Sequence, residues 1–181
     1  MGGHCIPIDP FYLTWKAREY DFSTRFIELA GEINLRMPYF VVEKAARILG
    51  TQRKSLRGAK VLVLGVAYKK DIPDERESPA LKVIQILLKE GAEVSYHDPC
   101  IPEVEVTNGD YGPAAKQVRL WSVPLDDEVL RSADMVIITT DHSCVDYARV
   151  VEQAQAVLDT RGVTRGNHPK EWASVPCKGM L

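Results

Sequence analysis

Strand-like and helix-like patterns alternate from residue 60 onward, and this alternation constrains the fold more than any other feature. An apolar run at 61–66 precedes a helix pattern that opens at Ser78-Pro79 and closes at Gly91, and a strand is then expected at 93–97. Serine at an N-cap, proline at the first helical position and glycine after the last are typical helix signals. Because parallel strands need helical crossovers, the pattern predicts an α/β fold with a doubly wound, mainly parallel sheet.

The remainder of the chain continues this pattern up to about Thr164. The stretch from Pro102 to Lys116 carries Asn-Gly and Gly-Pro pairs and is expected to be a surface loop. Residues 51–181 are therefore expected to form one α/β domain. Its further elements are predicted as strands at 118–123, 135–140 and 156–159 and helices at 126–132 and 145–155.

A long helix is expected before this domain, within residues 1–50. Apolar residues recur at helical spacing through 26–49, Ser23 can cap the start, and Gly50 can end the helix. Pro38 removes a backbone hydrogen bond and should kink the helix near Asn34. The apolar positions spread beyond one stripe, so the helix needs partners on more than one side. The partner is either the core of the same domain or a second copy of the chain.

Composition excludes some functions. The net charge of -2 gives no general attraction to nucleic acid or to an anionic membrane. No apolar run reaches about 18 residues and no leader precedes the first glycines, so we expect a cytoplasmic protein. Each of the four cysteines has a histidine nearby, but none belongs to a C-x-x-C pair, so free thiols are expected and no metal site is predicted. A zinc-binding regulatory domain is the alternative.

The first dozen residues combine a nucleophile, a carboxylate and residues that bend the chain. Gly2 and Gly3 allow the backbone to approach a ligand. Asp9 precedes a proline and is expected to cap a helix that runs to about Tyr20. Cys5 should then lie just before a helix N-terminus, where partial positive charge favours a thiolate, and Asp9 could orient or deprotonate a water. Alternatively, Cys5 is a structural cysteine in a Gly/Pro turn.

Polar residues also follow three of the expected strands, where open α/β sheets bind their ligands. The loop at 65–79 is too long for a dinucleotide fingerprint and lacks G-x-G-x-x-G, but Lys69 offers a point charge and Arg76 a planar fork for phosphate or carboxylate. A solvated charged loop is the alternative. The other candidates are Asp141, His142 and Arg161, together with His97, although both histidines are more often structural at such positions.

Two of these stretches resemble motifs of the UDP-glucose/GDP-mannose dehydrogenase family. Residues 2–9 match its catalytic-cysteine motif Gly-Gly-x-Cys-x-x-x-Asp, and Tyr68-Lys69, followed seven residues after the lysine by Arg-Glu-Ser, is similar to its second signature. The continuation to Tyr12 is most similar to the branch that oxidises UDP-N-acetylmannosamine or UDP-N-acetylglucosamine at C6. Ile8 stands where the UDP-glucose branch usually has lysine.

The resemblance implies a two-step, NAD-dependent oxidation of a UDP-sugar C6 alcohol to a carboxylate. Cys5 would capture the intermediate aldehyde, and Asp9 would assist the water that releases the product. By the same resemblance, substrate would be held by Tyr68, Lys69 and Arg161, and the NAD cofactor would be reached by Arg76.

The resemblance extends from Met1 to about Thr164 and covers only the second half of the family's chain. It implies that helix 23–49 is the central helix and builds a homodimer, and that an N-terminal domain with the NAD fingerprint lies outside this sequence. The 181 residues alone would then be inactive. The alternative is a nucleotide-sugar-binding or dimerisation module without catalysis.

Overall fold

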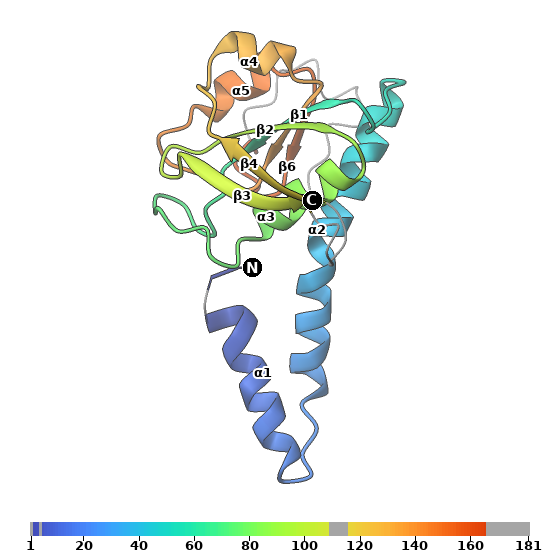
Figure 1. Cartoon of the computed structure of the whole chain (residues 1–181), viewed down its shortest axis with the longest axis vertical. Helices are drawn as coiled ribbons and strands as arrows, with labels where there is room; N and C mark the ends of the chain where they lie inside the picture. The colour runs from blue at the N-terminus through green and yellow to red at the C-terminus, as the bar shows by residue number, and fades with distance from the viewer. Residues whose placement is uncertain (1, 4, 109–115, 166–181) are drawn as a thin grey trace.

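A computed structural model describes residues 2–3, 5–108 and 116–165 of the chain (Figure 1). Some of the expectations fall wholly or largely outside this part. They concern His4, the Gly-Pro pair at 112–113, the pair His168 and Cys177, and the tail beyond residue 165. The helices are α1 (Cys5–Arg18), α2 (Arg25–Thr51), α3 (Pro79–Lys89), α4 (Asp127–Ser132) and α5 (Tyr147–Gln153). The strands are β1 (Lys60–Leu64), β2 (Glu93–His97), β3 (Glu103–Asn108), β4 (Lys116–Trp121), β5 (Met135–Ile138) and β6 (Val157–Asp159).

The predicted α/β fold is confirmed. Four parallel strands form a sheet in the order β2-β1-β5-β6. After β1 the chain adds β2 at one edge of the sheet, and after β5 it adds β6 at the other edge. Helix α3 begins where the sequence predicted, because Ser78 accepts a hydrogen bond from the Ala80 backbone and Pro79 occupies the first helical position. Gly91 follows it with φ +85°.

Alternate residues of the strands pack into two separate hydrophobic cores, one on each face of the sheet. Val61 and Val63 pack with α2 and α3 on one face of the sheet, while Leu62 and Leu64 pack with α4 and α5 on the other. Figure 1 shows these helix pairs on opposite sides of the strands. Strands buried on both faces explain the nearly continuous apolar run that begins at Val61.

The predicted loop between Pro102 and Lys116 is wrong in its first half. Residues 103–108 form β3, which pairs antiparallel with β4. Val104 and Val106 are buried in the core that contains α3, and they alternate with glutamates that face outward. This period of two is a strand signal, which the neighbouring turn residues obscured.

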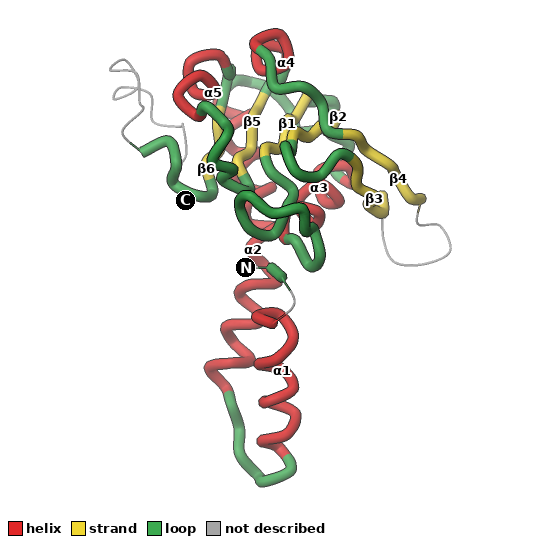
Figure 2. Tube along the Cα trace, turned by 90° about the vertical axis from the view of Figure 1, so that its left-hand side faces the viewer, coloured by secondary structure: helices red, strands yellow, loops and turns green. Residues whose placement is uncertain are grey.

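The two N-terminal helices form an antiparallel hairpin that projects from the domain (Figure 2). The prediction that Asp9 caps the first helix is wrong, because α1 begins at Cys5 and contains Asp9 and Pro10. A helix that starts at Cys5 tolerates Pro7, because the backbone amides of the first turn have no acceptor within the helix in any case. Helix α1 ends at Arg18, before the expected Tyr20.

The expected ends of the long helix also shift. Thr24, rather than Ser23, precedes α2, and its hydroxyl donates to the Thr14 hydroxyl of α1 at 2.8 Å instead of capping its own helix. Helix α2 includes Gly50 and ends at Thr51. The kink expected near Asn34 stays a prediction. None of the helices in the described ranges is long and apolar enough to cross a membrane.

The long helix α2 has two environments. In its second half, the side chains buried in the domain core are Val41, Val42, Ala45, Ile48 and Leu49. Its first half and α1 leave large apolar side chains exposed, including Phe26 at 89%. A surface for a second copy of the chain would therefore lie on the hairpin rather than at Val41 or Val42. The most exposed of the large apolar side chains on the hairpin are Tyr12, Leu13, Trp15, Tyr20, Phe22, Phe26 and Leu35.

Candidate functional site

A cavity of about 190 Å³ opens beyond the carboxyl ends of the central strands. Its wall comes from five places: the loop after β1 with Tyr68, the residues after β5 with Thr140, Arg161 after β6, the start of α3 at Ser78, and α2 with Met37, Pro38 and Val41. The backbone of Gly2 also contributes. This is the edge at which strand order reverses, where α/β sheets bind ligands, and both Tyr68 and Arg161 line the cavity there.

The strand ends approach each other closely here because residue 65 is glycine. Gly65 has φ +83°, and a Cβ at this position would lie 2.4 Å from the carbonyl oxygen of Thr140. The Thr140 hydroxyl donates to the Ala67 carbonyl at 2.6 Å and fixes the loop after β1 against the end of β5. These two contacts hold together the part of the cavity that Ala67 and Thr140 line, which we call the cavity floor.

The buried carboxylate of Asp98 organises the same loop from the other side. Its Oδ2 accepts hydrogen bonds from the backbone amides of Val66 and Ala67 at 2.7 and 3.0 Å. Its Oδ1 accepts from the amides of Cys100 and Ile101 at 2.8 and 3.1 Å. Asp98 is 3% exposed, so these bonds replace water entirely and hold β1 and β2 in register at their carboxyl ends.

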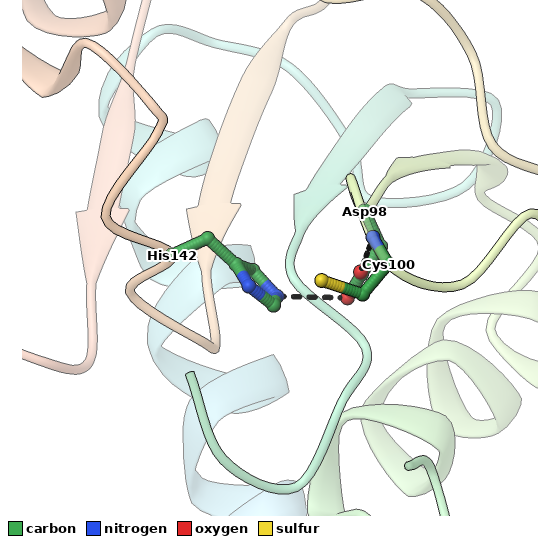
Figure 3. Close-up of side chains that lie close together, drawn as sticks. All are labelled: Asp98, Cys100 and His142. Atoms are coloured by element: carbon green, nitrogen blue, oxygen red, sulfur yellow. Dashed lines mark hydrogen bonds and ion pairs between the residues drawn. The ribbon is translucent and has the colours of Figure 1, made fainter. Parts of the chain in front are cut away.

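His142 completes this network and is structural (Figure 3). Its Nδ1 accepts from the Asp71 amide at 3.1 Å, so neutral His142 carries its proton on Nε2, which lies 3.0 Å from Asp98 Oδ2. The side chain is 1% exposed. The other candidate histidine, His97, places Nδ1 2.8 Å from the Val123 carbonyl oxygen. Both histidines therefore have structural partners.

Asp98, Cys100 and His142 place one potential ligand atom each within 4.8 Å of the others (Figure 3). The residues do not fit a metal ion. The His142 Nε2 that faces the carboxylate carries a proton rather than a lone pair, and both carboxylate oxygens already accept two or more hydrogen bonds. Burial, and then the charge of Asp98, raises the pKa of the Cys100 thiol, which disfavours the thiolate that a metal requires.

Arg161 is positioned by two aspartates. Asp159 accepts from the amides of Arg161 and Gly162 at 2.8 and 2.7 Å and so shapes the turn after β6. The Nε of Arg161 donates to Oδ1 of Asp141 at 2.9 Å. Asp141, a weaker candidate from the sequence, thus holds the guanidinium at the cavity wall.

The predicted loop residues divide between the cavity and the solvent. The Tyr68 amide donates to the Asp74 carbonyl at 3.0 Å and closes the loop, while the exposed Arg76 donates from Nε and Nη2 to the Asp74 carboxylate at 2.9 and 2.7 Å. These hydrogen bonds lower the pKa of Asp74 to about 2. Lys69 is also exposed, and neither it nor Arg76 lines the cavity.

Cys5 and Asp9 are exposed on the first turns of α1, outside the cavity wall. The glycines before them are seated against the second motif. A Cβ on Gly2 would lie 2.4 Å from the Glu77 carbonyl oxygen, and one on Gly3, whose φ is +88°, would lie 2.8 Å from a ring carbon of Tyr68. The sequence did not reveal this contact, although the paired glycines were its signal.

Comparison with known proteins identifies two family models. Residues 62–166 match the UDP-glucose/GDP-mannose dehydrogenase family, UDP binding domain, and residues 1–36 match the central domain of the same family. UDP-N-acetyl-D-mannosamine dehydrogenase of Methanocaldococcus jannaschii is 36% identical over 144 residues, which cover 78% of this chain and 28% of that protein. UDP-N-acetyl-D-glucosamine 6-dehydrogenase of Pseudomonas aeruginosa is 30% identical over 112 residues, or 62% of this chain and 26% of that protein.

Solved structures show the same similarity. UDP-D-ManNAc dehydrogenase from Pyrococcus horikoshii superposes with a TM-score of 0.70 at 26% identity, covering 94% of this chain and 36% of that one. The UDP-N-acetyl-mannosamine dehydrogenase Cap5O from Staphylococcus aureus gives 0.61 at 28% identity, covering 90% and 35%. The chain thus spans roughly a third of the length of these relatives. With its UDP binding domain matched over more than half of the sequence, the chain belongs to the UDP-glucose/GDP-mannose dehydrogenase family.

Proposed function

We propose that this chain is the C-terminal part of a cytoplasmic, NAD-dependent dehydrogenase that oxidises C6 of a UDP-N-acetylhexosamine. One observation carries the proposal: the glycines of the cysteine motif are seated on the wall of the switch-point cavity, against Tyr68 and Glu77. The names of the relatives support the N-acetylated substrate. Residues 1–50 would supply the nucleophile and the dimer hairpin, and residues 51–181 the nucleotide-sugar site.

The cavity suits a phosphorylated ligand. Arg161 provides a guanidinium at the wall, steadied by Asp141, and can form charge-assisted hydrogen bonds to phosphate. The N-terminus of α3 faces the same space and favours negative charge. Tyr68 adds an aromatic surface, and Lys69, the next residue in the chain, is an exposed positive charge outside the cavity wall.

The proposed chemistry uses Cys5 twice. After the first oxidation, its sulfur adds to the C6 aldehyde and gives a thiohemiacetal, which keeps the aldehyde from leaving. Loss of the second hydride leaves a thioester, and water then cleaves the carbon–sulfur bond to give the carboxylate and the free thiol. Asp9, one helical turn after Cys5, would accept a proton from that water.

NAD, when bound, would accept both hydrides. The sequence contains no G-x-G-x-x-G, so most of the cofactor site would lie in a segment that this chain does not contain. The residues present fit a peripheral role. Arg76 is exposed, and its planar fork already holds a carboxylate, Asp74, in the manner in which it would hold a phosphate.

The test measures NADH formation with UDP-N-acetylmannosamine and UDP-N-acetylglucosamine. The complete enzyme containing this chain should be active, and the 181-residue chain alone should not be. Cys5→Ser should abolish carboxylate formation and spare UDP binding, because an alkoxide forms far less readily than a thiolate. Cys144→Ser, at another exposed cysteine, is the matched control and should retain activity. Undiminished oxidation by Cys5→Ser would refute the proposed chemistry.

A binding or dimerisation module without catalysis is the second candidate. The exposed apolar side chains of the hairpin favour it, because such surfaces usually bind another protein. It predicts UDP binding and self-association by the complete protein with no NADH formed from any UDP-sugar.

A further inference from the structure

The ring of Tyr68 serves two surfaces at once. It forms part of the cavity wall, and it also lies under the backbone of Gly3. Gly3 is buried, whereas Cys5, two residues later, is exposed. Two residues of chain span at most about 7 Å, so the position of the Tyr68 ring limits where the sulfur of Cys5 can lie relative to the cavity.

Residue 3 is glycine for two separable reasons. Its φ of +88° disfavours any side chain, and a Cβ would lie 2.8 and 2.9 Å from the Cε2 and Cδ2 atoms of the Tyr68 ring. Gly2 is packed equally closely: a Cβ built on it would lie 2.4 Å from the Glu77 carbonyl oxygen and 2.7 Å from Pro79 Cδ. The ring and the start of α3 thus form a seat for this segment.

The seat is itself fixed by the loop that carries Arg76. The amide of Tyr68 donates to the carbonyl oxygen of Asp74 at 3.0 Å, and the Asp74 carboxylate binds Arg76. The backbone from which the ring projects is therefore held in this closed loop. Tyr68 thus contacts the segment that carries Cys5 through its ring, lines the cavity, and joins the loop through its backbone amide.

We propose that Tyr68 is a positioning residue, whose ring supports Gly3 and thereby directs Cys5 toward the sugar of a nucleotide-sugar bound in the cavity. The inference rests on the proposed function for its ligand, but the contact of the ring with Gly3 does not. It assigns Tyr68 an effect on the reaction rate at Cys5 that is larger than its effect on ligand affinity. The hydroxyl group of Tyr68 is not required for this role.

The contact is tested first, without ligand, by NMR of the 181-residue chain. A glycine packed on an aromatic ring has ring-current-shifted α-proton resonances. The shift at Gly3 should persist in Tyr68→Phe and disappear in Tyr68→Leu, while Tyr20→Leu, at an exposed tyrosine on the hairpin, should leave it unchanged. An unshifted Gly3 resonance in the wild type would overturn the inference, whatever the chain binds.

The effect on Cys5 is tested with a UDP-hexose analogue that carries a bromoacetyl group on C6. The Cys5 sulfur displaces bromide and forms a thioether, which peptide mass spectrometry locates. The half-saturating concentration reports binding, and the maximal rate reports the placement of the sulfur. Tyr68→Leu should lower the maximal rate about ten-fold or more, since small displacements of a reacting group are costly, and Tyr68→Phe should restore it.

Iodoacetamide, which does not need the cavity, separates placement from reactivity. It should alkylate Cys5 at similar rates in the wild type, Tyr68→Leu and Tyr68→Phe. An unchanged maximal rate in Tyr68→Leu would overturn the inference while leaving the proposed function intact. Labelling of Cys5 that does not saturate with the analogue would instead refute the proposed UDP-sugar site, and the NMR result would still decide the contact.

Discussion

Replacing Asp98 with asparagine should destabilise the domain by about 2–6 kcal/mol. The carboxylate accepts from Val66, Ala67 and His142 through Oδ2, and from Cys100 and Ile101 through Oδ1. An asparagine amide replaces one of these acceptors with a donor. Even in the better orientation, its NH2 group faces two amides that then have no acceptor, and each such loss costs about 1–3 kcal/mol.

Urea unfolding of the 181-residue chain, followed by circular dichroism, measures this change. Asp126→Asn is the matched control, since Asp126 accepts a hydrogen bond from the Val129 amide as the N-cap of α4 and asparagine caps helices equally well. The free energy of unfolding of this control should lie within about 0.5 kcal/mol of that of the wild type. If the free energy of unfolding of Asp98→Asn lies within about 1 kcal/mol of that of the control, the role assigned to these hydrogen bonds is refuted.

Three further predictions concern the cavity floor, the charged loop and the hairpin. Gly65→Ala should cost at least about 2 kcal/mol in urea unfolding, because a positive φ and a contact with the Thr140 carbonyl oxygen both oppose a Cβ. In steady-state kinetics of the complete enzyme, Lys69→Ala should raise the KM for the UDP-sugar and Arg76→Ala the KM for NAD; equal effects of both on both ligands would indicate a purely structural loop. Light scattering should show a dimer at micromolar concentration that Phe26→Glu weakens, because Phe26 is 89% exposed; a monomeric wild type would contradict the interface.

Local signals made much of the fold predictable. Strand β2 spans Glu93–His97 as expected, and α3 starts at its Ser78 cap, because each signal lies within a few residues of the element it specifies. Strand β3 was missed because its two buried valines were outweighed by turn residues nearby. Helix α1 began earlier than predicted because Asp9 and Pro10 form a strong start signal that is tolerated inside a helix.

The site was less predictable, because its geometry depends on residues far apart in sequence. Strand-end reasoning placed the loop at 65–79 and Arg161 at one edge of the sheet, and the resemblance added Tyr68 of that loop. The paired aspartate and arginine at 141 and 161 follow from the adjacent β5 and β6. The carboxylate of Asp98 contacts loops 31 and 44 residues away, and nothing in its immediate neighbours indicates those partners. The contact of Gly3 with the Tyr68 ring also joins residues far apart in the sequence.

Calorimetric titration of UDP into the 181-residue chain tests the central claim, that the cavity beyond β1 and β5 is a nucleotide-sugar site. UDP should bind with one site per chain, and Arg161→Ala should weaken binding about ten-fold, the loss expected for a charge-assisted hydrogen bond. Arg149→Ala, which removes an exposed arginine paired with Asp127 outside the cavity, should bind as the wild type does. Absence of UDP binding, or equal affinity in Arg161→Ala and the wild type, would contradict the account.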